Sequence, residues 1–180
     1  MILKTERLTL RPWHESDAGS LFKYAKDERV GTVAGWPPHR SEEESLDVIR
    51  NIFSQDGVFA ITLNGEDEAI GCVGLICGAK SNFPLPDSEG EISYWLGVPH
   101  WGAGIVPEAV KEIIGYAFGE LGLKALWCGY FDGNEQSRKV QEKCGFVYHH
   151  TSPEVYCCAT ERYKTEHVTC LTYEDWMFMK

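Results

Sequence analysis

Two glycines just ahead of a helical pattern are the residues best suited to chemistry. Gly102 and Gly104 lie in a loop between an apolar segment, Ile92–Val98, and a helical pattern that begins at Ile105. Glycines let a backbone turn sharply and approach a ligand closely. The first amides of a helix have no partner within the helix and lie at the positive end of its dipole. The spacing therefore predicts a site for a phosphate group.

The two common phosphate-loop motifs are absent from the sequence. It contains no G-x-x-x-x-G-K-[ST], and no G-x-G-x-x-G in a βαβ pattern followed by an acidic residue about 20 positions later. The loop therefore favours neither an ordinary nucleotide hydrolase nor a dinucleotide enzyme.

Length and charge narrow the classes of partner. The chain has 180 residues, 43% of them apolar, which is enough for one domain with its own core, residues 1–180. A net charge of −10 disfavours nucleic acid as a partner, because phosphate backbones need a basic surface. No apolar run approaches the ~20 residues that span a bilayer. Met1–Arg11 lacks the apolar region of a signal peptide, so we expect a cytoplasmic protein without a membrane partner.

The cysteines indicate reduced thiols. There are seven, an odd number, and none forms a C-x-x-C pair. A structural zinc site is therefore not expected, and no metal ligand is assigned. A thiol enzyme remains an alternative, although no His/Asn pattern supports it.

Periodicity predicts the elements that position the loop. Alternating segments indicate strands, and apolar residues at helical spacing indicate helices. The predicted strands are Leu3–Pro12, Val58–Leu63, Ala69–Cys77, Ile92–Val98, Ala125–Tyr130, an interrupted strand over Phe146–His150 and Val155–Cys158, and His167–Leu171. The predicted helices are Ala18–Lys26, Ser41 to about Ser54, Val106–Leu121 and Glu135–Cys144, with a short turn over Tyr173–Met179. Val30–Arg40, with two glycines and two prolines, is predicted to be a loop with an exposed Trp36.

This order of elements predicts the fold class. A run of antiparallel strands followed by strand–helix–strand–helix–strand indicates a mixed α/β fold. We expect a central, mostly antiparallel sheet of six to seven strands with helices on both faces.

Three stretches together resemble the GNAT N-acetyltransferases. They are Trp101–Ala109 (WGAGIVPEA), Asn134–Phe146 (NEQSRKVQEKCGF) and Thr5–Pro12 (TERLTLRP). They are most similar to the branch that includes ribosomal-protein N-terminal acetyltransferases. The resemblance covers essentially the whole chain and implies direct transfer of an acetyl group from acetyl-CoA to a primary amine in a ternary complex. The acceptor would be a protein N-terminus or a small molecule, and the oligomeric state, a homodimer included, stays open.

The resemblance also implies the residues that hold acetyl-CoA. A strand that separates from its neighbour would offer free backbone groups to the pantetheine arm, and the loop would hold the pyrophosphate. The implied contacts are Tyr94, Leu96, Trp101, Gly102, Ala103, Gly104, Ile105, Val106, Asn134 and Ser137.

The predicted catalytic residues are Glu91 and Ser137. Glu91, at the start of the central strand, would act as the base or hold the amine, and Ser137 would serve the leaving thiolate. Trp36 would form a wall of the acceptor site. Each has a structural alternative: a salt-bridged or solvated strand end for Glu91, a helix-start serine that caps or packs for Ser137, and a lid or packing role for Trp36.

Two departures from the family pattern favour an alternative function. Many relatives place a tyrosine acid where this chain has Gln141, and Val106-Pro107 stand where smaller or hydroxyl residues are usual. Val106 would narrow the space beside the pyrophosphate. A non-catalytic acyl-CoA-binding or sensing domain is therefore the alternative to an enzyme.

Overall fold

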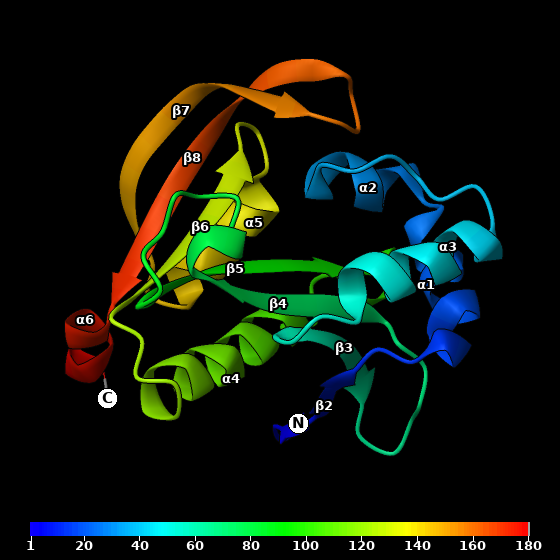
Figure 1. Cartoon of the computed structure of the whole chain (residues 1–180), viewed down its shortest axis with the longest axis horizontal. Helices are drawn as coiled ribbons and strands as arrows, with labels where there is room; N and C mark the ends of the chain where they lie inside the picture. Colours follow the sequence, from blue (N-terminus) through cyan, green and yellow to red (C-terminus); the bar gives the residue numbers. More distant parts are fainter. Residues whose placement is uncertain (180) are drawn as a thin grey trace.

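The computed structural model describes residues 1–179, which fold around one open sheet of eight strands (Figure 1). The strand order is β1-β2-β3-β4-β5-β6-β8-β7, and only β5 and β6 are parallel. The strands are β1 (Leu3–Lys4), β2 (Leu8–Pro12), β3 (Val58–Leu63), β4 (Gly71–Cys77), β5 (Glu89–Leu96), β6 (Ala125–Phe131), β7 (Val147–Cys157) and β8 (Arg162–Thr172). The predicted mixed, mostly antiparallel sheet is confirmed. It has one strand more than expected because a turn at Thr5, whose hydroxyl accepts from the Leu8 amide (2.9 Å), divides the first strand in two.

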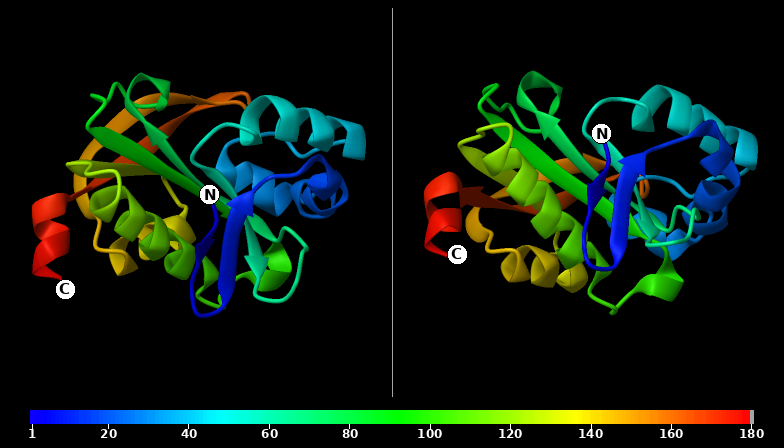
Figure 2. Two further views of the ribbon diagram at one scale, coloured as in Figure 1. Left: turned by 60° about the horizontal axis from the view of Figure 1, so that its bottom comes forward. Right: turned by 90° about the horizontal axis from the view of Figure 1, so that it is seen from below.

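Helices cover both faces of the sheet, as predicted (Figures 1 and 2). They are α1 (Ala18–Ala25), α2 (Glu28–Ala34), α3 (Glu42–Val48), α4 (Ile105–Gly119), α5 (Glu135–Lys143) and α6 (Tyr173–Phe178). α4 and α5 cover one face, while α1, α2 and α3 lie on the other, beneath the tip of the β7–β8 hairpin.

Side-chain caps begin several helices where the sequence indicates. Ser41 accepts from the Glu44 amide (3.1 Å) at α3, and Asn134 accepts from the Ser137 amide (3.1 Å) at α5. Thr172 caps α6 in the same way through the Asp175 amide. By contrast, α4 has no side-chain cap, which leaves its first amides available.

The predicted loop over Val30–Arg40 is wrong in its first half. Asp27 accepts from the Arg29 amide (3.0 Å) and begins α2, which runs to Ala34. Gly31 lies inside this helix. The position needs a glycine because a Cβ there would collide with the backbone carbonyl of Trp36 and crowd its ring. This glycine therefore permits close packing rather than breaking the helix, and Trp36 is half-buried instead of exposed.

Two apolar residues near the ends of the predicted helices are exposed. Leu121 is 46% exposed because α4 ends at Gly119, before the predicted end of the helix. Ile52 is 49% exposed because α3 continues as a π-helical turn over Ile49–Phe53, which rotates its later side chains away from the α-helical pattern.

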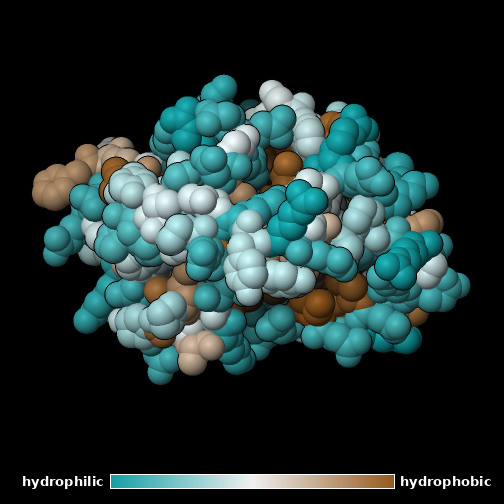
Figure 3. Space-filling view, turned by 90° about the horizontal axis from the view of Figure 1, so that it is seen from above, coloured by the Kyte–Doolittle hydropathy of each residue, from teal (hydrophilic) through white to brown (hydrophobic). Residues whose placement is uncertain are grey.

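The C-terminal hairpin is longer than predicted. β7 is one interrupted strand, as expected, with irregularities in its pairing near Tyr148 and Ser152. β8 begins at Arg162 rather than His167, so the hairpin extends over α2 (Figure 1). Seen from the hairpin side, the surface is mostly hydrophilic, with apolar residues recessed between polar ones (Figure 3). Within residues 1–179, no helix has the length and apolar character needed to cross a membrane.

Candidate active site

The sheet opens between its two parallel strands. β5 pairs with β6 only over Glu89–Glu91, opposite Ala125–Trp127, whereas β4 stays paired with β5 as far as Leu96. Beyond Glu91 the two strands therefore diverge and leave a gap. Such a gap exposes backbone groups that a ligand can pair with.

The free backbone groups in this gap belong to the predicted residues. Pairs in an antiparallel ladder alternate between bonded and non-bonded. The Gly97 amide bonds to the residue before β4 (2.9 Å), so Trp95 and Ser93 form the next bonded pairs with β4. The backbone groups of Tyr94 and Leu96 therefore face the gap. The Leu96 carbonyl already accepts from the Trp101 indole (2.7 Å), which fixes the start of the loop.

The glycine loop presents a row of unpaired amides. Gly102 and Gly104 both adopt φ +76°, a left-handed conformation that suits glycine. Within residues 1–179, no acceptor is hydrogen-bonded to any of the five consecutive amides of residues 102–106. Pro107 has no amide to satisfy. These amides open the 15-residue helix α4 and suit an anion.

An ion pair holds this loop against the first strands. Arg7 donates to the carbonyl of Ala103 (2.9 Å) and to the carboxylate of Glu108 (2.6 Å). Burial tends to raise the pKa of Glu108, but hydrogen bonds from Thr5 and Arg7 outweigh burial and lower it. The opening T-x-R-L motif therefore braces the loop, a role the sequence alone did not reveal.

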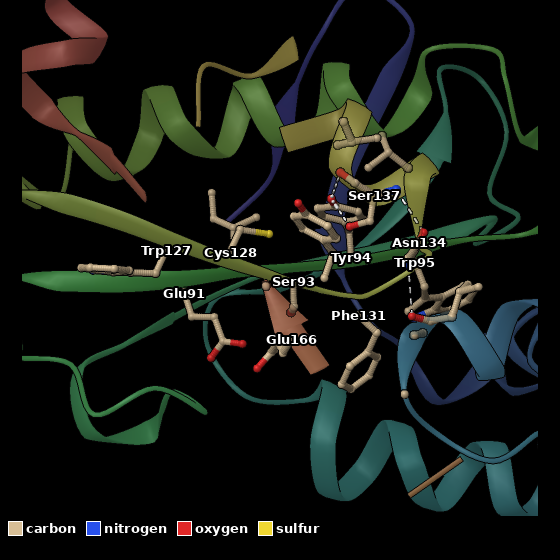
Figure 4. Close-up of a pocket in the computed structure, with 18 of the residues that line it drawn as sticks. Glu91, Ser93, Tyr94, Trp95, Trp127, Cys128, Phe131, Asn134, Ser137 and Glu166 are labelled. Carbon is tan, nitrogen blue, oxygen red and sulfur yellow. Dashed lines mark hydrogen bonds between the residues drawn. The ribbon is translucent and has the colours of Figure 1, made fainter. Parts of the chain in front are cut away.

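One cavity of about 1020 Å³ joins the loop to the gap and continues to the opposite face of the sheet. It is lined by Gly102, Gly104 and Val106 at one end and by the carboxylates of Glu91 and Glu166 at the other. Figure 4 shows Tyr94 and Ser137 on one side of β5, and Glu91, Ser93 and Glu166 on the other. The site thus has a hydroxyl side and a carboxylate side.

Ser137 lies at the centre of the hydroxyl side. Its Oγ is 2.8 Å from the Tyr94 hydroxyl and accepts from the Gln141 side-chain amide (3.2 Å). Gln141 is almost fully buried, and its orientation is fixed because its nitrogen donates to the Gly129 carbonyl (3.1 Å) while its oxygen accepts from Thr169 (2.7 Å). Burial holds the pKa of Tyr94 well above its ordinary value, so the phenol stays protonated and can donate.

The Ser137 hydroxyl has one hydrogen-bonding direction left for a ligand. The Tyr94 hydroxyl also lies 3.3 Å from the Ser137 carbonyl oxygen, so either hydroxyl can be the donor in the 2.8 Å contact. A serine hydroxyl has one donor and two acceptor positions. When Tyr94 and Gln141 both donate to Oγ, the two acceptor positions are filled. The remaining direction, that of the Ser137 proton, is available to the cavity that this residue lines.

Glu91 on the carboxylate side is held in place. It is buried and accepts three hydrogen bonds, from the Ser81 hydroxyl (2.8 Å), the Asn82 amide (2.7 Å) and the Asn82 side chain (3.0 Å). It is therefore not a solvated strand end.

The described residues show no metal site, and the buried thiol that lines the cavity is not activated. No group of three or more His, Cys, Asp or Glu within residues 1–179 could hold a metal ion. Cys128, which lines the cavity, is buried, and burial raises its pKa well above the ordinary value and disfavours its thiolate.

Comparisons with known proteins agree with this geometry. The family profile described as "Acetyltransferase (GNAT) domain" matches residues 7–147. The chain belongs to the GNAT acetyltransferase family. It is 34% identical over 149 residues to the uncharacterized N-acetyltransferase p20 of Bacillus licheniformis, covering 80% of this chain and 81% of that protein. It is 31% identical over 147 residues to the putative ribosomal N-acetyltransferase YdaF of Bacillus subtilis, covering 79% of each chain.

Solved structures agree on the fold. A GNAT-family acetyltransferase from Bacillus anthracis superposes with a TM-score of 0.84 at 20% identity, over 97% of this chain and 99% of that one. Family membership makes this chain an N-acetyltransferase, as the three sequence motifs predicted.

The structure of this GNAT acetyltransferase brings most of the predicted site residues to one cavity. Of these, the cavity lining includes Tyr94, Leu96, Trp101, Gly102, Gly104, Ile105, Val106, Asn134, Ser137 and Glu91. The side-chain oxygen of Asn134 already caps α5. Ala103 is outside the lining and contributes its carbonyl to Arg7. Trp36 is also outside it, packed edge-on against Trp95 with ring centroids 6.1 Å apart.

Sequence reasoning missed Glu166 in this GNAT acetyltransferase. Its side chain shares a face with Phe131, its partner on β6, and lines the cavity. One signal was available in the sequence of β8, where side chains alternate between the two faces of the sheet. Glu166 is the acidic residue on the face that also carries the apolar Val168 and Cys170. That signal needed the pairing of β8 with β6 before it could point to a site.

Proposed function

We propose that the chain transfers an acetyl group from acetyl-CoA to a primary amine by direct attack in a ternary complex. The observation that carries this proposal is the row of unpaired amides at residues 102–106, which leads into the gap between β5 and β6. A diphosphate satisfies such amides and the positive end of the α4 dipole together.

The residues around the gap fit the rest of acetyl-CoA. The backbone of Tyr94 faces the gap and can pair with the amide groups of the pantetheine arm. Lys139 and Lys143 on α5 line the same cavity and add positive charge on the phosphate side. Val106 also lines this cavity. Its position is compatible with the prediction that the Val106 side chain narrows the space beside the pyrophosphate.

Ser137 serves the leaving sulfur in this proposal. Acetyl transfer from a thioester forms a C–N bond, breaks the C–S bond and leaves a thiolate that must receive a proton or a hydrogen bond. In this proposal Tyr94 and Gln141 both donate to the Ser137 Oγ, so the Ser137 proton points to the sulfur and meets this need. The backbone amide of Tyr94, which faces the gap, is the donor available to the developing oxyanion.

The alternative is a domain that binds acetyl-CoA without turning it over. The hydroxyl group of Tyr94 beside Ser137 favours the enzyme, because it places a phenol at the thiol end despite Gln141. Calorimetry with acetyl-CoA and a thiol-release assay with a panel of primary amines separate the two functions. Binding with release of CoA supports the proposal, whereas binding without release on any amine supports a sensor. No binding at millimolar acetyl-CoA refutes both.

A further inference from the structure

Two carboxylates reach the far side of the gap, and they differ in their partners. Glu91 on β5 accepts three hydrogen bonds, so its oxygens are largely occupied. Glu166 on β8 is half-buried, and within residues 1–179 its carboxylate has neither a hydrogen-bond donor nor an ion-pair partner. A half-buried carboxylate without a donor retains its full capacity to accept a proton or an N–H group.

The backbone is shaped to admit the Glu166 side chain. A Cβ on Gly129 of β6 would collide with the Glu166 carboxylate, so the glycine lets this side chain lie across β6 toward β5. Figure 4 shows Glu166 beside Ser93 and pointing to the same side of β5 as Glu91. Ser137 lies on the opposite side. The carboxylate and the hydroxyl therefore approach the gap from its two faces.

The surroundings on this side are apolar and acidic. Phe83, Pro84 and Phe131 line the cavity there. Among residues 1–179 no arginine lines it, and the two lysines that do, Lys139 and Lys143, lie on α5 at the opposite end. The Lys164 ammonium, outside the lining, lies over the Phe131 ring, 5.1 Å from its centroid. The unpartnered carboxylate therefore suits a ligand that carries a cationic group and also has apolar groups.

We infer that Glu166 binds the ammonium group of the acceptor and takes its proton, and that Glu91 adds the negative charge that selects amines of net positive charge. This inference rests on the proposed function and deepens it. It assigns the amine-binding and proton-accepting role to a residue of β8 and makes Glu91, the base predicted from sequence, a positioning and charge-selecting residue.

The chemical step balances with these groups. The Glu166 carboxylate removes one proton from R–NH₃⁺ and becomes a carboxylic acid. The neutral nitrogen attacks the thioester carbon, so the C–N bond forms and the C–S bond breaks. The second nitrogen proton passes to the sulfur by way of Ser137. Glu166 then releases its proton to water, and the products are the N-acetylated amine and the CoA thiol.

The electrostatics of Glu166 suit a base. Burial raises its pKa, and the nearby charge of Glu91 raises it further. The other titratable groups around it are Cys128 on β6, His150 on β7 and Lys164, two positions earlier on β8. A carboxylate with a raised pKa is a stronger base.

The experiment uses three amines of one chain length that differ at the far end. 1,4-Diaminobutane carries an ammonium there, n-butylamine a methyl group and 4-aminobutyrate a carboxylate. With wild-type protein and saturating acetyl-CoA, kcat/KM should fall in that order. Glu166→Gln should lower kcat/KM for the diamine by at least ~100-fold at pH 7 and should remove the rise with pH that reports the base. It should leave the affinity for acetyl-CoA unchanged within about twofold.

The matched control is Glu154→Gln, which removes an exposed carboxylate on β7 outside the cavity. Equal rates and pH profiles for the Glu166 and Glu154 variants would overturn the inference. So would a preference of the wild-type protein for 4-aminobutyrate, a measurement that needs no variant if Glu166→Gln fails to fold. A protein that binds acetyl-CoA but acetylates none of the three amines also overturns it. The proposed function itself is overturned by a different result: no binding of acetyl-CoA by the wild type, or no CoA release with any amine of the wider panel.

Discussion

The Tyr94 hydroxyl should act on catalysis only through Ser137. Tyr94→Phe keeps the ring and removes a hydroxyl that lies 2.8 Å from the Ser137 Oγ and 3.3 Å from the Ser137 carbonyl oxygen. A hydrogen bond between neutral groups contributes about 1 kcal/mol net, which corresponds to about fivefold in rate. Without it, one acceptor position of Ser137 is empty, and its proton is no longer confined to the direction of the sulfur. We therefore expect kcat to fall about fivefold.

A double-mutant cycle tests whether this effect passes through Ser137. Ser137→Ala removes the proposed donor and should lower kcat by roughly 100-fold, the low end of acid catalysis, because a serine hydroxyl is a weak acid. In the Ser137→Ala background, Tyr94→Phe should then have no further effect, since the group it orients is gone. The assay is CoA release under saturating acetyl-CoA and amine, with acetyl-CoA affinity measured in parallel.

The outcome of the cycle decides between two roles for the phenol. A double variant about 500-fold slower than wild type, the product of the two single effects, would show that Tyr94 acts on the reaction independently and would refute the orienting role. Tyr116→Phe on α4 is the matched control. It removes a phenol outside the cavity and should leave kcat unchanged.

Three further predictions test the loop, the fold and the carboxylate side. Gly104→Asn and Gly104→Asp add side chains of nearly equal size that both tolerate φ +76°, and they differ in charge. A Kd for acetyl-CoA at least about tenfold higher for Asp than for Asn therefore isolates the charge effect, and equal values by calorimetry contradict the loop assignment. Arg11→Met leaves the carboxylate of Asp17, now 2.8 Å from Arg11, buried without its partner, and should lower the free energy of unfolding in urea by about 3–5 kcal/mol. Because the pKa of Glu166 is raised by burial and by Glu91, the folded protein binds its proton more tightly than the unfolded chain and loses stability as pH rises through that pKa. Glu166→Gln should therefore melt at a higher temperature than wild type at pH 8 but not at pH 4, and a lower melting temperature at pH 8 would contradict this.

The cofactor side of the site could be predicted because it is contiguous in the sequence. β5, the loop with Gly102 and Gly104, and the start of α4 follow one another, so spacing alone places the unpaired amides. The gap beside them is a property of the pairing between strands. Sequence supplied it only through the family resemblance.

The acceptor side could not be predicted, because its residues meet only in the folded sheet. Glu166 reaches the cavity because β8 lies beside β6 and because Gly129 leaves room for its side chain. The three donors to Glu91 come from the long loop after β4, whose sequence has no motif that we could interpret. Trp36 was placed on the acceptor wall from its loop position, but α2 turns it toward Trp95.

Gln141 shows how a departure from a family pattern can be compensated from another element. Read alone, the replacement of a tyrosine on α5 removes a hydroxyl from the thiol end and favours a domain without catalysis. In the fold, Tyr94 on β5 places its phenol beside α5, with its hydroxyl 2.8 Å from the Ser137 Oγ. Gln141 then has a different role. Its side-chain amide is fixed by hydrogen bonds to Gly129 and from Thr169, and its nitrogen donates to the Ser137 Oγ. An asparagine-sized or apolar side chain at position 141 could not make both contacts, so the glutamine fits a site in which serine is the donor to the leaving group.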